Sequence, residues 1–300
     1  MSRKCDLCGH NNFEKLINKN GFDVVKCQNC DLVFVYPQPS DKVMKHLYSI
    51  KKGYKFHYNL SFFEDRLKTI MKFKKSGKLL DVGCSTGEFL IIAKKYNWDV
   101  YGVEVSEDAG RIAKSINKLS VFVGKLEDAK YPNKKFDVIS LGDVIEHVRF
   151  PSKFLHEVHR ILRDNGIVFI STPNIDSFFP NITYKIFKKI NYEWPHPKPP
   201  YHLFEFSDKT IKKLLYNKNF VISMLNFKRI GLIHAIDGIY LIRMKLKKMF
   251  KTKSIKIVPE LFYLVSLKVL FTLLYFLDYF IFLFAKRGNT MDIIVRKKFM

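Results

Sequence analysis

Four cysteines near the start of this 300-residue chain have the spacing of a zinc site. They form two Cys-x-x-Cys pairs with 18 residues between the pairs: Cys5, Cys8, Cys27 and Cys30. Two such turns supply four thiolates for tetrahedral zinc. Short strands are predicted at 13–17 and 23–26, so residues 1–36 are predicted to form a zinc ribbon. Such a site usually stabilises a module too small to fold alone, and we expect the zinc to be structural, not catalytic.

A second candidate site is a glycine-containing loop between the first strand and the first helix predicted after the ribbon. The loop carries Asp81, Gly83, Ser85 and Gly87. Glycines let a ligand approach the backbone closely, and the start of a helix offers free N–H groups. Dinucleotide enzymes use a related loop, but the Gly83-x-Ser85-x-Gly87 spacing differs from the dinucleotide pattern.

This loop lies in a segment where short apolar runs alternate with amphipathic helices. The predicted strands are 78–83, 99–104, 120–123, 136–141, 167–171, 220–226 and 291–296. The alternation indicates a parallel sheet covered by helices on both faces, and a turn at Asn165 and Gly166 is expected before the fifth strand. Glu104 ends the second strand, while Leu126 and Glu127 follow the third. These positions fall at the carboxyl ends of adjacent strands, where open α/β sheets bind ligands.

The same segment resembles the cofactor signature of class I methyltransferases that use S-adenosylmethionine (SAM). The resemblance rests on four runs: Leu80–Leu90, Tyr101–Ser106, Phe136–Val148 and Phe154–Gly166. It is closest to the branch that includes ubiquinone-type O-methyltransferases, and to zinc-ribbon methyltransferases associated with surface-glycan synthesis. It implies an α/β fold with a seven-stranded, doubly wound (Rossmann-like) sheet.

The resemblance also implies a set of cofactor-binding residues: Asp81, Gly83, Ser85, Gly87, Glu104, Leu126, Glu127 and Gly142. Asp81 and the two loop glycines would frame the methionine end of SAM, and Glu104 would hold the ribose. Leu126 and Glu127 would lie near the adenine, and Gly142 would line the cleft. Ser85 stands where a middle glycine is usual, so its φ is expected to be negative. Lys125 stands where many relatives have an acid.

Candidate catalytic residues follow the fourth strand. If the acceptor is a hydroxyl, a nearby base helps to remove its proton. His147 is the best base by residue type, with Glu146 as its orienting partner and Asp143 close by. The alternative is that Glu146 and His147 only hydrogen-bond the loop. His202 lies in a proline-rich loop and resembles a position near the acceptor pocket in relatives, while a metal site formed by His196 and His202 is disfavoured.

An insertion at 231–288 separates the last two predicted strands. Seven basic residues fall within 243–256, and 257–285 is nearly all aliphatic and aromatic. Three charged residues in this apolar stretch fall on one helix face, which suits a segment lying in the membrane interface. We therefore predict peripheral membrane contact through 243–287. The alternative is a hydrophobic hairpin used for dimerisation or core packing.

The predicted domains are a ribbon at 1–36, a helical linker or cap at 37–77, and a methyltransferase domain at 78–300. The formal net charge of +24 suits anionic partners. Paired cysteines without a disulfide framework indicate the cytoplasm, here with contact to the inner face of the membrane. The expected activity is O-methylation of a saccharide or a lipid-linked small molecule. One alternative is an RNA methyltransferase that grips RNA through its ribbon and basic surface, and another is a scaffold that has lost transfer.

Overall fold

The computed structural model describes residues 4–40, 42–44, 60–189, 194, 196–228, 269, 273, 276–277 and 288–298. The chain divides into two compact units. One comprises Met1–Pro173, Pro199–Asn226 and Met291–Met300, and the other comprises Asn174–Lys198 and Phe227–Thr290. Residues 41 and 45–59 of the predicted cap, and most of the insertion, lie outside the described residues. The predicted membrane contact through 243–287 is therefore described only at 269, 273, 276 and 277.

A seven-stranded sheet forms the larger unit, in the order β10-β11-β8-β7-β4-β5-β6. Its strands are β4 (Lys78–Val82), β5 (Asp99–Glu104), β6 (Val121–Val123), β7 (Phe136–Gly142), β8 (Leu162–Pro173), β10 (Phe220–Lys228) and β11 (Thr290–Lys297). The five strands β4 to β8 pair in parallel as predicted. The last two predicted strands, β10 and β11, are neighbours in the sheet although the insertion separates them along the chain.

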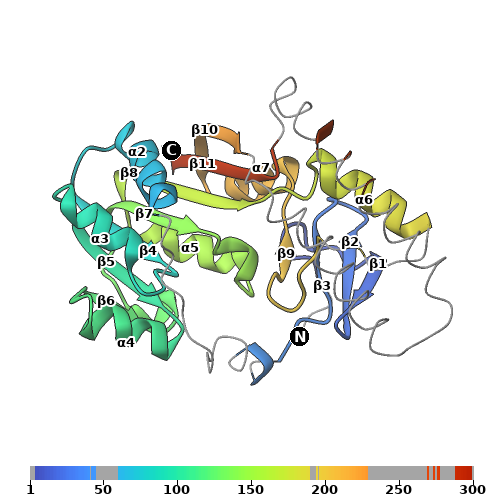
Figure 1. The fold of residues 1–300 in the computed structure, drawn as a ribbon, viewed down its shortest axis with the longest axis horizontal. Helices are drawn as coiled ribbons and strands as arrows, with labels where there is room; N and C mark the ends of the chain where they lie inside the picture. Colours follow the sequence, from blue (N-terminus) through green and yellow to red (C-terminus); the bar gives the residue numbers. More distant parts are fainter. Residues whose placement is uncertain are drawn as a thin grey trace. The chain divides into compact units, whose positions relative to one another are not determined.

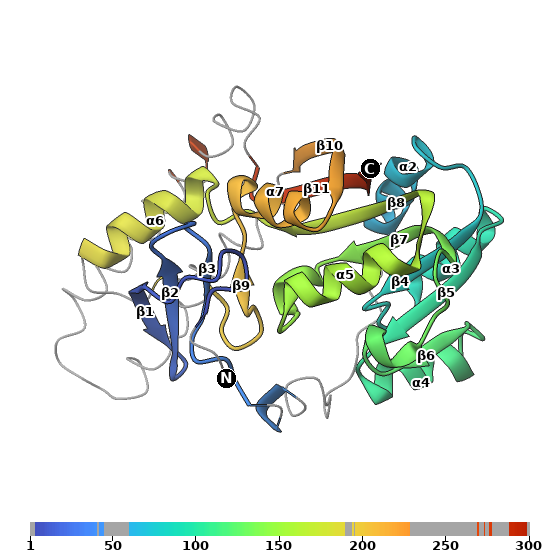
Figure 2. The same ribbon diagram turned by 180° about the vertical axis from the view of Figure 1, so that it is seen from behind.

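Helices cover both faces of this sheet, because its central strands β4 and β7 are buried along nearly their whole length and need cover on both sides. The helices of this unit are α2 (Ser61–Met71), α3 (Glu88–Lys95), α4 (Glu107–Ser115), α5 (Pro151–Ile161) and α7 (Asp208–Asn217). Figure 1 shows α2 and α3 on one face, and Figure 2 shows α5 and α7 on the other. The core between the layers includes Leu79, Phe89 and Val138, all buried.

The turn expected at Asn165 and Gly166 takes a different form. The chain is already extended from Leu162, where β8 begins. Pairing with β7 then jumps from Phe136–Leu162 to Val138–Ile167. The turn residues therefore form an irregularity within a strand and do not precede it.

A second sheet contains the predicted ribbon strands, in the order β1-β2-β3-β9. Its strands are β1 (Phe13–Lys19), β2 (Phe22–Cys27), β3 (Val33–Val35) and β9 (Phe204–Glu205). The hairpin turn between β1 and β2 uses Asn20 and Gly21, whose φ values of 52° and 79° match a type I′ turn. The β9 strand comes from far along the chain, so the ribbon sheet is completed by the proline-rich loop region.

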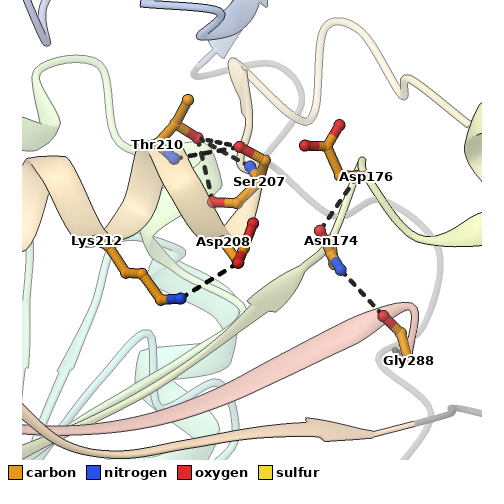
Figure 3. A network of polar contacts seen from close by, with 7 residues as sticks. All are labelled: Asn174, Asp176, Ser207, Asp208, Thr210, Lys212 and Gly288. Carbon is orange, nitrogen blue, oxygen red and sulfur yellow. Dashed lines mark hydrogen bonds and ion pairs between the residues drawn. The ribbon is translucent and has the colours of Figure 1, made fainter. Parts of the chain in front are cut away.

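The smaller unit contains α6 (Phe178–Lys189) and the ends of the insertion. Figure 3 shows Asn174 donating its side-chain N–H to the Gly288 carbonyl, at 3.2 Å. A Cβ placed on Gly288 would lie 2.0 Å from the Lys228 carbonyl oxygen, so the chain enters and leaves the insertion at adjacent points. Among the residues that the structure describes, no helix has the length and apolar character needed to span a membrane.

Candidate active site

Asp81 and Arg66 form an ion pair at the carboxyl end of β4. Arg66 reaches from α2, and its Nη1 lies 3.6 Å from Asp81 Oδ1, with both side chains less than 8% exposed. Burial raises the pKa of Asp81 to about 6, although the Arg66 charge acts in the opposite direction. Asp81 Oδ1 and Arg66 Nε have no hydrogen-bond partner within the described part of the chain. The ion pair therefore offers unused polar atoms to a ligand.

Arg66 was not identified from the sequence. Its guanidinium group lies between 5.0 and 5.7 Å from the centres of four aromatic rings: Phe62, Phe63, Phe89 and Phe169. A Cβ on Gly142, at the end of β7, would lie 2.1 Å from Arg66 Nη2. Gly142 thus makes room for the guanidinium group. The only feature of the sequence that could have pointed to Arg66 is its place among aromatic residues in a predicted helix. No motif spacing relates it to Asp81.

The loop after β4 is held by Glu104, at the end of β5. Glu104 Oε2 accepts a hydrogen bond from the Ser85 backbone N–H and Oε1 accepts one from Ser106, each at 2.8 Å. The expected negative φ at Ser85 is wrong, because its φ is 52°. The left-handed conformation turns the Ser85 N–H toward the carboxylate, and this bond offsets the steric cost to a non-glycine residue. Burial raises the pKa of Glu104, while the backbone N–H groups oppose that shift.

The remaining predicted cofactor residues surround this loop. Gly83 and Gly87 have positive φ values of 71° and 93°, and Gly87 begins α3. A Cβ on Gly87 would lie 2.2 Å from Leu119 Cδ1, so only glycine fits there. A short 3₁₀ helix, η1 (Leu126–Ala129), follows β6, with Leu126 buried and Glu127 exposed. All of these residues lie at the carboxyl ends of β4, β5, β6 and β7.

Three candidate catalytic residues follow β7. Asp143 has a φ of 55° and donates its backbone N–H to the Ser171 carbonyl at 2.9 Å. Glu146 and His147 lie in the 3₁₀ helix η2 (Ile145–His147). Glu146 does not orient His147 as expected: its Oε2 accepts a hydrogen bond from Thr172 Oγ1 at 3.0 Å.

His147 is oriented by the proline-rich loop instead. His147 Nδ1 lies 2.7 Å from the Tyr201 carbonyl oxygen, and the His147 and His202 rings meet edge to face with 5.0 Å between their centres. Burial lowers the pKa of His147 to about 4, with His202 adding to the shift. Burial also raises the pKa of Glu146 to about 8, helped by Asp143. The structure thus brings together four predicted residues that are 59 positions apart at their extremes.

Leu203 links this cluster to the ribbon. Its backbone N–H donates to the Glu146 carbonyl at 2.8 Å, and its own carbonyl accepts from the Val35 N–H in β3 at 2.9 Å. The Phe34 and Phe204 rings stack alongside, with 6.1 Å between their centres. The loop that carries His202 is therefore held by the ribbon sheet, a connection that the sequence did not predict.

The four ribbon cysteines converge as predicted. Cys5 Sγ lies 3.6 Å from Cys30 Sγ, and Cys8 Sγ lies 3.5 Å from Cys27 Sγ. No disulfide joins them. Tetrahedral Zn²⁺ with bonds of about 2.3 Å requires sulfur separations of about 3.8 Å, so these thiols could hold a metal with little movement.

Comparison with known proteins identifies the family. A sequence profile described as a methyltransferase domain matches residues 54–223, more than half of the chain. The chain belongs to this methyltransferase family. Its α/β fold and seven-stranded sheet are those of class I SAM-dependent methyltransferases. A solved SAM-dependent methyltransferase from Methanosarcina mazei shares the fold, with a TM-score of 0.51, 14% identity, and coverage of 77% of this chain and 98% of that one.

Two curated methyltransferases show partial sequence similarity. The ubiquinone biosynthesis O-methyltransferase of Pelagibacter ubique is 36% identical over 105 residues, which cover 33% of this chain and 43% of that protein. The ajmaline N-methyltransferase of Rauvolfia serpentina is 32% identical over 105 residues, covering 32% of this chain and 36% of that protein. The similarity thus spans less than half the length of either protein.

The residues around Asp81 fit SAM on their own chemistry. The amino-acid end of SAM carries an ammonium group and a carboxylate. Asp81 Oδ1 and Arg66 Nε are buried polar atoms with complementary charge and no hydrogen-bond partner among the described residues. The Glu104 carboxylate accepts backbone hydrogen bonds from Ser85, Ser106 and Val105, and an ionised carboxylate has about four acceptor positions, so it could also accept from a ribose hydroxyl.

Proposed function

We propose that this methyltransferase transfers a methyl group from SAM to a hydroxyl oxygen of a saccharide or a lipid-linked small molecule. The observation that carries the proposal is the cluster of Glu146, His147 and His202 beside the residues that fit SAM. Ligand atoms of these three side chains lie within 4.8 Å of one another. The cluster supplies carboxylate and imidazole groups where an acceptor would meet the cofactor.

On the cofactor side, the proposed role of the protein's residues is to bind SAM and to orient its methyl group. SAM, when bound, supplies an electrophilic methyl group on a positively charged sulfur. Asp81 would hold the ammonium group and Arg66 the carboxylate, while Glu104 would accept hydrogen bonds from the ribose. Displacement at a methyl carbon requires the attacking atom to be in line with the leaving group, so fixed positions lower the barrier.

On the acceptor side, the cluster supports an oxygen acceptor more than a nitrogen acceptor. A hydroxyl oxygen attacks well only when its proton is being removed, whereas a neutral amine already has an available lone pair. A site built for a hydroxyl therefore needs groups that make proton loss easier, and Glu146, His147 and His202 can serve this purpose. The name of the Pelagibacter relative agrees with oxygen as the methylated atom, whereas the Rauvolfia relative is named for methylation of nitrogen, so the proposal depends on the cluster.

We also propose that the cysteine cluster binds a structural zinc ion and that the enzyme works in the cytoplasm at the membrane surface. The sulfur separations support the zinc site. The membrane contact rests on the composition of 243–287, where basic residues adjoin a long apolar stretch. An acceptor carried on a lipid would be accessible from such a surface.

The test uses purified protein, SAM labelled in its methyl group, and an extract of the source cells. The extract is separated afterwards into lipid, saccharide, RNA and protein fractions. We expect label in the lipid or saccharide fraction. Label confined to RNA would contradict the proposed acceptor and favour an RNA methyltransferase, and no label in any fraction would contradict the activity.

A matched pair of variants ties the activity to the site. Asp81→Ala should abolish cofactor binding and all labelling, because it removes the carboxylate beside Arg66. Asp164→Ala is the control, since this exposed aspartate lies near the start of β8 and pairs with Lys134 and Lys297, away from the residues proposed to hold SAM. Equal labelling by both variants would refute the assignment of the cofactor site.

A further inference from the structure

A cavity of about 390 Å³ is lined mainly by basic and amide side chains at the amino ends of the parallel strands. Its volume falls within the range of about 300–1,000 Å³ that is usual for small-molecule sites. The cavity is lined by Asn133, Lys134, His159, Arg160, Asp164, Asn219, Lys297 and Lys298. None of these residues belongs to the candidate active site or was assigned a role from the sequence.

The cavity lies at the opposite edge of the sheet from the candidate active site. Lys134 precedes β7, and Asp164 lies near the start of β8. Asp81 and Thr172, by contrast, lie near the carboxyl ends of β4 and β8. Thr172 follows Ile167 by five positions of regular strand, which at about 3.3 Å per residue is about 16 Å. A ligand in the cavity is therefore neither SAM nor the methyl acceptor.

Positive charge exceeds negative charge in the cavity. Its permanent cations are Lys134, Arg160, Lys297 and Lys298, and one carboxylate, that of Asp164, lines it. Asp164 Oδ2 lies 2.7 Å from Lys134 Nζ, and Oδ1 lies 3.4 Å from Lys297 Nζ, so two ammonium groups share one carboxylate. The Lys297 side chain is only 10% exposed. Burial of an ammonium group is costly unless an anion meets it, and a second anion in the cavity would reduce this cost.

Arg160 is held in place at the cavity wall. Its guanidinium group makes a bidentate ion pair with Glu157, at 2.6 and 2.8 Å. It also donates to the Asn133 side chain and to the Tyr131 carbonyl. These bonds use four of the five N–H donors of an arginine. With Glu157 included, four cations and two carboxylates leave two positive charges uncompensated.

The opposite wall is held by the end of β11. The Lys298 backbone N–H donates to the Asn219 carbonyl at 2.8 Å, which joins this strand to the turn before β10. His159 faces the same space. Burial lowers the pKa of His159, and the Lys297 charge lowers it further, while Asp164 acts in the opposite direction. The walls of the cavity are therefore fixed by hydrogen bonds that leave its ammonium groups pointing at a shared space.

We propose that this cavity binds the phosphate monoester or diphosphate group of a small molecule or of a lipid headgroup. A phosphate monoester carries a charge of about −1.5 to −2 at pH 7 and three strong acceptor oxygens, which match the two uncompensated charges and the ammonium donors. A carboxylate ligand would supply only one charge. Lysine is a common ligand of phosphate groups. The site is independent of the proposed methyl transfer.

Isothermal titration calorimetry of the full chain with inorganic pyrophosphate, at physiological ionic strength, tests the site. We expect one pyrophosphate to bind per chain. Lys134→Gln and Lys297→Gln should each weaken its binding by at least about tenfold, because each removes a charge-assisted hydrogen bond. The NMR signals of the His159 side chain should shift during the titration, since His159 lines the cavity.

Asp164→Asn supplies a test whose expected result a folding defect cannot imitate. Removal of the competing carboxylate releases both lysines and should strengthen pyrophosphate binding by about two- to fivefold, the contribution of an exposed ion pair. The matched controls are Asp108→Asn and Arg111→Gln, which make the same charge changes in an exposed ion pair on α4. They should change the affinity by less than about twofold, because salt screens distant charges. Every variant should keep the wild-type SAM affinity.

Vesicles that contain phosphatidic acid identify the source of the phosphate group. If Lys297→Gln reduces sedimentation of the protein with these vesicles, a lipid headgroup occupies the cavity. If sedimentation is unchanged while pyrophosphate binding is weakened, a soluble phosphorylated molecule occupies it. Both results support the site.

Absence of pyrophosphate binding by the wild type, or wild-type affinity in Lys297→Gln, would overturn the proposal. Binding of an RNA oligonucleotide that depends on Lys297, without pyrophosphate binding, would also overturn it and would indicate a nucleic-acid surface. None of these measurements involves methyl transfer. Absence of methyl label in the extract fractions would therefore refute the proposed function and leave this site unaffected.

Discussion

The ion pair between Arg66 and Asp81 shows how a buried charge can be kept for binding. Four aromatic rings surround the guanidinium group, and water is excluded from both partners. Isolated burial of either charge would be strongly unfavourable, so each stabilises the other. Atoms of the pair still lack hydrogen bonds among the described residues, which is the state expected of a site that awaits a charged ligand.

The raised pKa of Asp81 predicts how SAM binding depends on pH. The carboxyl must be ionised to pair with an ammonium group, and its pKa is about 6. Affinity should therefore be full above this value and fall by about tenfold per pH unit below it. Arg66 opposes the shift, while Glu104 and Glu88 add to it. Isothermal titration calorimetry from pH 5 to pH 8 measures the profile.

The Asp81→Asn variant supplies the control for this profile. Loss of a charge-assisted hydrogen bond worth about 1.5–3 kcal/mol should weaken SAM binding about 10- to 100-fold at neutral pH. The remaining affinity should vary little between pH 5 and pH 7. A wild-type profile in this variant would show that another group titrates.

At the level of secondary structure, the ribbon is more than a separate stabilised module. Its β3 strand pairs with β9 and binds Leu203, and Leu203 binds the Glu146 backbone. The residues that we propose to hold SAM come from β4, β5 and α2, and none of these hydrogen bonds joins the ribbon to those elements. Cysteine geometry should therefore influence the acceptor side of the site more than the cofactor side.

Removal of the zinc ion that we propose for the cysteine cluster tests this division of roles. A chelator that extracts the ion should loosen β3 and reduce methyl transfer by at least about tenfold, because small displacements of positioning groups cost large factors in rate. SAM affinity should change by less than about twofold. Added Zn²⁺ should restore transfer. Elemental analysis confirms that the zinc has been lost. If methyl transfer is then unchanged, the ribbon does not influence the acceptor site.

The start of α7 provides a stability prediction. Figure 3 shows the reciprocal bonds of a capping box: Ser207 Oγ accepts from the Thr210 N–H at 3.2 Å, and Thr210 Oγ1 accepts from the Ser207 N–H at 2.9 Å. Ser207→Ala should lower the free energy of unfolding by about 1 kcal/mol. Ser115→Ala, at the exposed end of α4, should change it by less than about 0.5 kcal/mol. Urea denaturation compares the two variants.

At the scale of the whole molecule, the positive charge and the insertion both bear on the proposed membrane contact. The excess of 52 basic over 28 acidic residues gives the net charge of +24. The two ends of the insertion, at Lys228 and Gly288, lie next to each other. Residues 229–287 can therefore be replaced by a short linker without moving these two points apart. This closeness makes a clean deletion feasible.

The deletion tests membrane contact. Full-length protein should sediment with vesicles that contain anionic phosphatidylglycerol and much less with neutral phosphatidylcholine vesicles, because the basic run at 243–256 precedes the apolar stretch. The variant with 229–287 replaced should stay in the supernatant while keeping SAM affinity. Failure of the full-length protein to sediment with anionic vesicles would contradict the membrane contact.

Much of this protein followed from its sequence. Alternating apolar runs and glycine positions predicted the parallel strands and the loop around Asp81, because hydrophobic burial and backbone sterics act over a few residues. The spacing of the paired cysteines predicted that their four sulfur atoms come together, because each Cys-x-x-Cys turn directs two thiols to one point. Sequence could not place Arg66 against Asp81, show that Ser85 is left-handed, or bring His202 beside His147 in a loop that the ribbon holds. These contacts connect distant segments, and only packing of the folded chain decides which of the many exposed or buried side chains meet.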